Sequence, residues 1–374
     1  MSLNNPKIFW FSTGLLVIFA MARSYRPLSD WVYTHWLFNY ELEFVKRGLV
    51  GEVFRFLAVE PTYSFVYAIA YILLFSLVAV FSFMLIRLFK VEGDKSGLRW
   101  LVLVLIFSSA TFPHFHHDLG RFDTILLLGG LLLVLMSESY KGWGFWFLLT
   151  LALSLLILVH EGAFFIIVPF VLAFVLYIQR TKLAFVLTAV IFALMTLLTY
   201  QVSMHGKITQ VEFSEHLEAM QNQYGDRVSG GSLIVLHKTS LDDQLSFVST
   251  RVEWKLLEKH IVMLILLLPF FWLFLRVFKQ YGLSKFDRYD LLILMSSLSP
   301  LLLSFLGIDF FRWWALSITL FVSFVVLKAY HCPFFRICLN DVFLKSRKLV
   351  YTTLLFGLMA GPLGITGPFP MSPF

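Results

Sequence analysis

The chain has 374 residues, of which 59% are hydrophobic and only 14% are charged, and its formal net charge is +7. A single soluble core cannot bury so much apolar surface, so the composition excludes an ordinary soluble globular protein. The excess of Lys and Arg does not indicate a nucleic-acid-binding protein, because these residues cluster in loops between long apolar stretches. Cys332 and Cys338 lie in one basic segment, so no disulfide framework is expected.

The apolar stretches predict an all-α, polytopic integral membrane protein with about eleven transmembrane helices. Runs of about twenty nearly uncharged residues match the thickness of the hydrocarbon core of a bilayer. The sequence lacks the ten-residue alternation typical of membrane β-barrels. The first run follows Lys7 and has no small-residue cleavage site, so we expect a retained span rather than a signal peptide. The expected spans are residues 7–23, 64–87, 98–113, 122–137, 143–160, 162–179, 183–201, 260–277, 289–306, 312–328 and 349–366.

The distribution of Lys and Arg predicts the orientation of these spans. With the N-terminus in the cytoplasm, each cytoplasmic loop carries basic residues, as the positive-inside rule requires. The first outer loop is rich in Trp, Tyr and Phe and is expected to form interfacial helices. We expect three parts: a membrane module over residues 1–201, a large outer loop over 202–259, and membrane helices over 260–374.

Ionisable residues gather at span ends on the predicted outer side. Such groups cost free energy near apolar surroundings unless they are paired or hydrated, so they are candidates for a functional site. The second outer segment contains Asp118, Arg121 and Asp123. If a helix begins near Asp118, then Asp118 and Arg121 share one face and can pair. An acidic residue is also typical of a helix start, so a purely structural role stays open.

Histidines beside Asp118 raise the question of a divalent metal. His114, His117 and Asp118 offer imidazole and carboxylate ligands. Their spacing matches no strong metal signature. We therefore expect neither a metal nor another cofactor.

The first outer loop holds further candidates. Asp30 could cap an interfacial helix, or it could act as a base at the mouth of a dry cavity. Glu41 and Glu43 precede a basic pair in which Arg47 could clamp a phosphate. For Lys46, a contact with lipid headgroups explains the charge at least as well as phosphate binding in a site does.

Two short outer segments complete the set. Glu161 could cap the helix that follows it, or it could orient His160 as a base. Asp309 and Arg312 lie three residues apart at the start of a span. Trp313 follows them and is typical of an interfacial belt, although tryptophan faces also stack on sugars.

The order of these features resembles the GT-C superfamily of membrane glycosyltransferases. Residues 29–33, Ser-Asp-Trp-Val-Tyr, resemble the acid-containing motif of that superfamily's first outer loop, and residues 120–124, Gly-Arg-Phe-Asp-Thr, resemble its second outer-loop motif. The resemblance implies a polyprenyl-phosphate-linked sugar donor and an outward-facing site. The chain lacks the soluble C-terminal domain of many members and a plain acidic pair in the first loop. The catalytic acid of that loop therefore stays open among Asp30, Glu41 and Glu43.

The residue types fit an inverting sugar transfer. A lipid phosphate is a good leaving group that needs charge neutralisation, and the acceptor hydroxyl needs a base. In this hypothesis Asp30 is the base, and Arg47 and Arg121 bind the phosphate, with Arg312 as a further option. Asp118 and Asp123 are the other catalytic candidates, which would orient groups or bind acceptor hydroxyls. The remaining candidates, which would bind or orient substrate, are Glu41, Glu43, His160, Glu161, Asp309, Arg312 and Trp313.

Two alternatives share parts of this pattern. A Wzy-type polymerase of O-antigen or capsule repeat units also has many spans, a large outer loop and outer arginines. A lipid-linked glycan transporter or flippase predicts charges near mid-membrane, whereas the charges here lie at span ends. The expected setting is the bacterial inner membrane during surface-polysaccharide or lipopolysaccharide assembly. The expected partners are the lipid bilayer, a polyprenyl-linked sugar donor and a glycan acceptor, with no nucleic acid.

Overall fold

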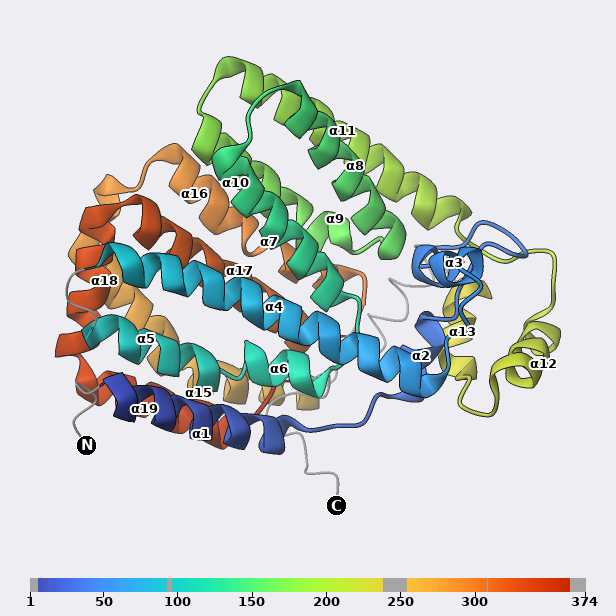
Figure 1. Cartoon of the computed structure of the whole chain (residues 1–374), viewed down its shortest axis with the longest axis horizontal. Coiled ribbons are helices and arrows are strands. Elements are labelled where there is room, and N and C mark those ends of the chain that lie inside the picture. Colours follow the sequence, from blue (N-terminus) through green and yellow to red (C-terminus); the bar gives the residue numbers. More distant parts are fainter. Residues whose placement is uncertain (1–5, 93–95, 238–253, 308, 364–374) are drawn as a thin grey trace.

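The computed structural model describes residues 6–92, 96–237, 254–307 and 309–363. Within these ranges the secondary structure is entirely helical, which confirms the all-α prediction (Figure 1). Part of the predicted outer loop 202–259 lies outside the described residues. The helices are α1 (Pro6–Ser24), α2 (Asp30–His35), α3 (Leu49–Phe56), α4 (Tyr63–Val91), α5 (Ser96–Phe107), α6 (Phe112–His117), α7 (Asp123–Ser139), α8 (Trp143–Val159), α9 (Ala163–Ile166), α10 (Val168–Gln179), α11 (Lys182–His205), α12 (Phe213–Tyr224), α13 (Gly230–His237), α15 (Trp254–Tyr281), η1 (Leu283–Lys285), α16 (Arg288–Ser296), η2 (Ser299–Phe305), α17 (Phe310–His331), α18 (Pro333–Lys345) and α19 (Arg347–Ala360).

Six helical segments of the described chain are long and apolar enough to cross a membrane, which indicates a multi-pass membrane protein. The expected count of about eleven spans is not confirmed. For example, α7 has 17 residues and α19 has 14, fewer than the roughly twenty that cross a bilayer without adjustment. The six segments are Tyr63–Val91, Ser96–His117, Lys182–His205, His260–Tyr281, Arg288–Phe305 and Phe310–His331.

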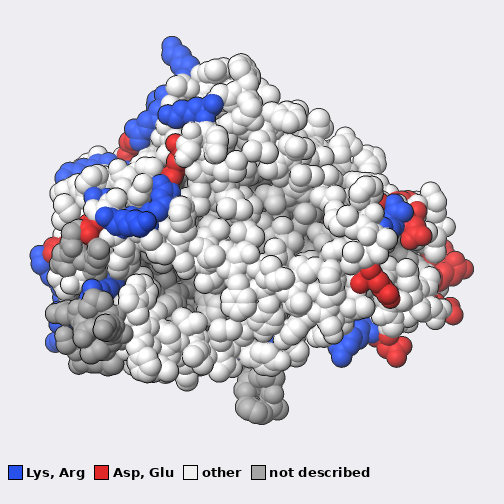
Figure 2. Space-filling view, in the orientation of Figure 1, with Lys and Arg blue, Asp and Glu red and all other residues white. Residues whose placement is uncertain are grey.

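The surface of the molecule matches a lipid environment. Charged side chains gather toward two ends of the face in Figure 2, and a broad band between them carries almost none. Large apolar side chains are exposed on the outer helices, among them Phe75, Phe147, Phe185 and Leu268. Soluble monomers rarely expose apolar patches of this extent, so we assign the uncharged band to the bilayer.

Helix α17 forms the centre of the bundle. Of its membrane-crossing window, 89% is buried, compared with 22% for α4 and for α11. A helix that is apolar on all sides is stable only when other helices surround it, and α17 packs against η2, α18 and α4. Because α17 is central, the side chains at its two ends meet residues from distant parts of the sequence.

The small helices α2, α3, α12 and α13 lie together at one end of the molecule, at the right of Figure 1, which we call the cap end. In α3, Phe56 and Leu57 just after it are 86% and 61% exposed, an arrangement typical of a helix that lies at a membrane interface. The other end, which we call the basic end, contains Lys90 at the end of α4 and Lys279 at the end of α15.

A buried ion pair fastens α16 to α17 near the basic end. Lys328 Nζ lies 2.7 Å from Asp290 Oδ2, and both side chains are less than a tenth exposed. Removing one partner of a buried pair leaves an uncompensated charge in a low-dielectric environment.

We expect Asp290→Asn to destabilise the fold by roughly 3–5 kcal/mol, because buried Lys328 would lose its carboxylate partner. Thermal unfolding of the purified protein in detergent would measure this loss. The double variant Asp290→Leu/Lys328→Met, which removes both charges, is expected to recover most of it. A double variant less stable than the single one would contradict this account.

Candidate functional site

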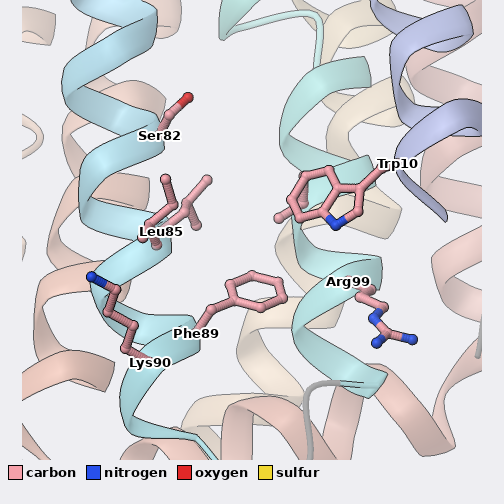
Figure 3. Close-up of a pocket in the computed structure, with 8 residues that line it drawn as sticks. Trp10, Ser82, Leu85, Phe89, Lys90 and Arg99 are labelled. Atoms are coloured by element: carbon pink, nitrogen blue, oxygen red, sulfur yellow. The ribbon is translucent and has the colours of Figure 1, made fainter. Parts of the chain in front are cut away.

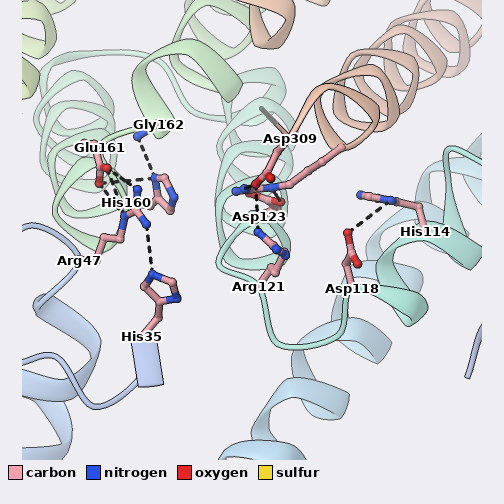
Figure 4. A network of polar contacts seen from close by, with 11 residues as sticks. His35, Arg47, His114, Asp118, Arg121, Asp123, His160, Glu161, Gly162 and Asp309 are labelled. Atoms are coloured by element: carbon pink, nitrogen blue, oxygen red, sulfur yellow. Dashed lines mark hydrogen bonds and ion pairs between the residues drawn. The ribbon is translucent and has the colours of Figure 1, made fainter. Parts of the chain in front are cut away.

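Two arginines and two aspartates meet where α7 and α17 begin. Arg312, in the first turn of α17, binds Asp123 at the start of α7 through two hydrogen bonds, one of them 2.7 Å long between Nη2 and Oδ1. Arg312 Nη1 also donates to Asp309 Oδ2 at 2.7 Å, and Arg121 Nη1 approaches the same oxygen at 3.4 Å. We call Arg121, Asp123, Asp309 and Arg312 the arginine–aspartate network; its labelled members are drawn in Figure 4.

The side chains of the arginine–aspartate network differ in solvent exposure. The side chains of Asp123 and Arg312 are 2% and 9% exposed, whereas Arg121 and Asp309 are 13% and 26% exposed. Burial would raise the pKa of Asp309, but the charges of Arg121 and Arg312 outweigh it and hold that pKa below its ordinary value. Asp309 is therefore an anion at neutral pH. The two hydrogen bonds between Arg312 and Asp123 fix the inner pair, and Arg121 is the more exposed of the two arginines.

Asp118 and His114 lie beside the network with unused hydrogen-bonding capacity. His114 is fully buried, and neither of its ring nitrogens makes a hydrogen bond to the part of the chain that the structure describes. Asp118 Oδ2 lies 3.9 Å from His114 Nδ1. Asp118 Oδ2 and Arg121 Nε are both buried, and neither has a hydrogen-bond partner within the described ranges. Buried polar atoms are nearly always bonded, so the lack of partners among the described residues marks this group of atoms as a candidate binding site.

The expected pairing of Asp118 with Arg121 on one helix face is wrong. Helix α6 ends at His117 and α7 begins at Asp123, so Arg121 lies in the turn between them. That turn depends on Gly120, whose φ is +84° and where an added Cβ would lie 2.5 Å from Leu28. The backbone carbonyl of Gly120 accepts a hydrogen bond from the Trp36 indole at 2.8 Å, which ties the turn to the first outer loop.

A second cluster centres on Arg47. Its Nη2 lies 2.6 Å from Glu161 Oε1, its Nε donates to both carboxylate oxygens, and its Nη1 lies 3.2 Å from His35 Nε2. Arg47 has φ of +64°, a left-handed conformation that non-glycine residues rarely adopt. Such strain persists where surrounding contacts hold it, and here the bidentate contact with Glu161 does so.

His160 is a neutral member of the second cluster. Its Nδ1 accepts the backbone N–H of Gly162 at 2.9 Å, which leaves the ring proton on Nε2. Burial, and then the Arg47 charge, lower the pKa of His160 to about 3. The 3.6 Å approach of Nδ1 to Glu161 is therefore not an ion pair at neutral pH.

The two clusters lie side by side toward the cap end of the bundle (Figure 4). They also interact electrostatically: burial and then Arg47 lower the pKa of His35, and the charge of Arg121 adds to the effect. His35 was not predicted as a site residue, because an uncharged ring inside a six-residue helix gives no distinctive signal in the sequence. Segments far apart in the sequence thus combine into one charged site.

The first-loop acids lie outside these clusters. Asp30 is 52% exposed and pairs with Arg227 at 3.2 Å. Glu43 accepts backbone hydrogen bonds from Thr209 and Gln210, at 2.9 and 2.7 Å, which anchors the first outer loop to the chain after α11. Glu41 is exposed. None of the three shares a described contact with the arginine–aspartate network.

Trp313 has a packing role in this structure. It is 5% exposed and packs edge-on against Phe310 with a centroid distance of 5.6 Å. For the metal alternative, no group of three or more His, Cys, Asp or Glu in the described ranges is placed to hold an ion. His114 and Asp118 approach one another there without a third ligand.

The cap end contains a histidine pair, His216 of α12 and His237 of α13, whose Nδ1 and Nε2 lie 3.0 Å apart. Burial, and then the neighbouring His237, lower the pKa of His216 to about 4. Because the pKa of His216 is lower in the folded state, the unfolded state takes up a proton first as the pH falls.

We expect the packing of α12 on α13 to be fully stable above about pH 6.5 and to loosen progressively between pH 6.5 and 4. Amide hydrogen exchange in α12, measured at pH 7.5 and 5 and corrected for the intrinsic rate, should rise by about tenfold. His216→Gln should remove most of this pH dependence. A wild-type protein whose corrected exchange in α12 is the same at both pH values would contradict the assignment.

No family model, curated protein or solved structure matches the chain. The site combines a partly exposed guanidinium, a buried carboxylate oxygen with no hydrogen-bond partner in the described residues, and arginine–aspartate pairs at the starts of α7 and α17. Such a site can bind an anion next to a base.

Proposed function

We propose that the chain is a membrane glycosyltransferase. It transfers sugar from a polyprenyl-phosphate or polyprenyl-diphosphate carrier to a glycan acceptor during assembly of a cell-surface polysaccharide or lipopolysaccharide. The observation that supports this proposal best is the arginine–aspartate network beside the unpartnered oxygen of Asp118.

Arg121 is the phosphate-binding group in this proposal. Its contact with Asp309 is long, at 3.4 Å, and its buried Nε has no hydrogen-bond partner among the described residues. A guanidinium presents its donors in a fork that matches a phosphate. Arg312 donates hydrogen bonds to Asp123 and Asp309, so its role is to position Asp309 beside Arg121.

Asp118 is the base. The acceptor hydroxyl oxygen attacks the anomeric carbon and gives its proton to Asp118 Oδ2. The bond between that carbon and the phosphate oxygen breaks, and its electron pair stays on the phosphate, which Arg121 neutralises. Attack from the face opposite the phosphate inverts the anomeric centre. We assign the base to Asp118 rather than Asp30, because Asp30 is exposed and paired with Arg227.

The site faces the outer side of the bacterial inner membrane in this proposal, and the N-terminus is cytoplasmic. The concentration of Lys and Arg at the basic end supports this orientation under the positive-inside rule (Figure 2). The placement of buried charge favours transfer over transport. Asp290 and Lys328 lie near the ends of their membrane-crossing segments, and the arginine–aspartate network lies at the opposite end of α17.

The proposal is tested by deleting the gene in its source strain and comparing the surface glycans. We expect the deletion to shorten or remove a glycan, and the wild-type chain to restore it. Asp118→Asn should fail to restore it at normal expression, whereas the exposed control Glu41→Gln should succeed. Loss of a whole ladder of repeats would identify the reaction as repeat-unit polymerisation. An unchanged glycan profile in the deletion strain would overturn the proposal.

A further inference from the structure

A separate cavity lies at the basic end between α1, α4 and α5 (Figure 3). Its volume is about 620 Å³. The apolar lining includes Trp10 of α1 and Leu85, Ile86 and Phe89 of α4. We call this cavity the α1–α4 groove.

The groove is accessible from the side of the bundle. Trp10 and Ile86 are 57% and 51% exposed, so its walls reach the surface that faces lipid. It extends along α4 from Ser82 to Lys90, about 12 Å at the helical rise per residue. Helix α1 packs on α5 and α6, so the groove separates α1 from α4.

The polar ends of the groove differ. Lys90 of α4 and Arg99 of α5 flank one end in Figure 3, and Ser82 lies at the other. Arg99 is held over the ring of Phe9, 5.7 Å from its centroid. The groove thus has an apolar length and two cationic groups at the level where the membrane meets water.

We propose that the α1–α4 groove binds an anionic phospholipid of the leaflet that borders the basic end. One acyl chain lies along Leu85, Ile86 and Phe89 and fills the space between α1 and α4. The phosphate contacts Lys90 and Arg99, because basic groups in pockets between membrane helices attract anionic headgroups. The bound lipid links the first helix to the rest of the bundle.

This proposal rests only on the membrane setting, since the groove lies at the opposite end of α4 from the arginine–aspartate network. A failed lipid test leaves the sugar-transfer proposal intact, and the reverse also holds. Charge complementarity distinguishes this occupant from a zwitterionic lipid, which would fill the apolar length without preferring Lys90 and Arg99.

The fluorescence of Trp10, which lines the groove, reports on a bound lipid, because bromine atoms on an acyl chain quench a tryptophan that they contact. The protein is reconstituted in nanodiscs of phosphatidylcholine doped with brominated phosphatidylglycerol or brominated phosphatidylcholine. Subtracting the emission of Trp10→Phe isolates the signal of Trp10. We expect brominated phosphatidylglycerol to reach half-maximal quenching at a several-fold lower mole fraction than brominated phosphatidylcholine.

Lys90→Gln/Arg99→Gln should abolish this preference. The matched control Arg276→Gln/Lys279→Gln removes two basic residues from the last turns of α15, outside the groove, and should retain it. Equal quenching of wild-type Trp10 by the two lipids, or quenching by neither, would overturn the proposal. So would a preference that survives in the Lys90/Arg99 variant.

Discussion

Asp118→Asn is expected to reduce sugar transfer by about two to four orders of magnitude, the usual contribution of a positioned general base. Asparagine keeps the shape of the side chain but cannot take the acceptor proton at Oδ2. Donor binding should change little, because Arg121, the proposed phosphate contact, is untouched. The glycan formed in complemented cells, normalised to protein in the membrane, measures the effect.

Asp30→Asn is the matched control for this prediction, since it makes the same chemical change in an exposed carboxylate. It should retain most of the activity and lose only the surface ion pair with Arg227, worth about 0–1 kcal/mol. An inactive Asp30→Asn beside an active Asp118→Asn would move the base to the first outer loop and contradict the assignment.

Arg121→Ala is expected to reduce sugar transfer by about a hundred- to a thousandfold, since it removes a charge aimed at the leaving phosphate. Thermal stability should fall little, because Arg121 is partly exposed and makes a single long contact with Asp309. Arg121→Lys should recover only part of the activity, because an ammonium cannot present the guanidinium fork.

Arg312→Ala provides the contrast for Arg121→Ala. It should lose stability by roughly 3–5 kcal/mol, because Asp123 would stay buried and unpaired. Activity and stability should thus separate at Arg121 and fall together at Arg312. If Arg121→Ala also unfolds the protein, its role is structural and the phosphate assignment fails.

The helical class of the fold and the membrane setting follow from composition and apolar run length alone. The local part of the site was also predictable. Asp309 and Arg312 are three residues apart at the start of a helix, and they do form an ion pair of 2.7 Å.

The partners from distant segments could not be predicted. Asp123 and Arg312 are 189 residues apart, and their contact depends on how α7 packs beside α17. The sequence places many charges at span ends and does not specify which of them meet. Asp30 and Asp118 look alike on that basis, yet one is exposed and the other is buried.

The backbone conformation at Arg47 and Gly48 could not be predicted from the sequence either. In Arg47-Gly48 the glycine is the natural residue for a left-handed conformation, but Arg47 adopts it and Gly48 does not. Tertiary contacts decide this: an added Cβ at Gly48 would lie 2.4 Å from the ring of Tyr40, so the glycine is needed for close packing. The left-handed turn at Arg47 then accompanies the contact of its guanidinium with Glu161.

Binding of undecaprenyl phosphate tests, without knowledge of the sugar, whether the arginine–aspartate network binds a lipid phosphate as we propose. Titration of the purified protein, followed by native mass spectrometry, should show saturable binding to wild-type protein. Binding should weaken at least about tenfold in Arg121→Ala, the loss of one charge-assisted contact. Arg227→Ala, which removes an exposed arginine at the cap end, and Lys90→Gln/Arg99→Gln should bind as wild type does. Equal affinity in Arg121→Ala and wild type would contradict the account.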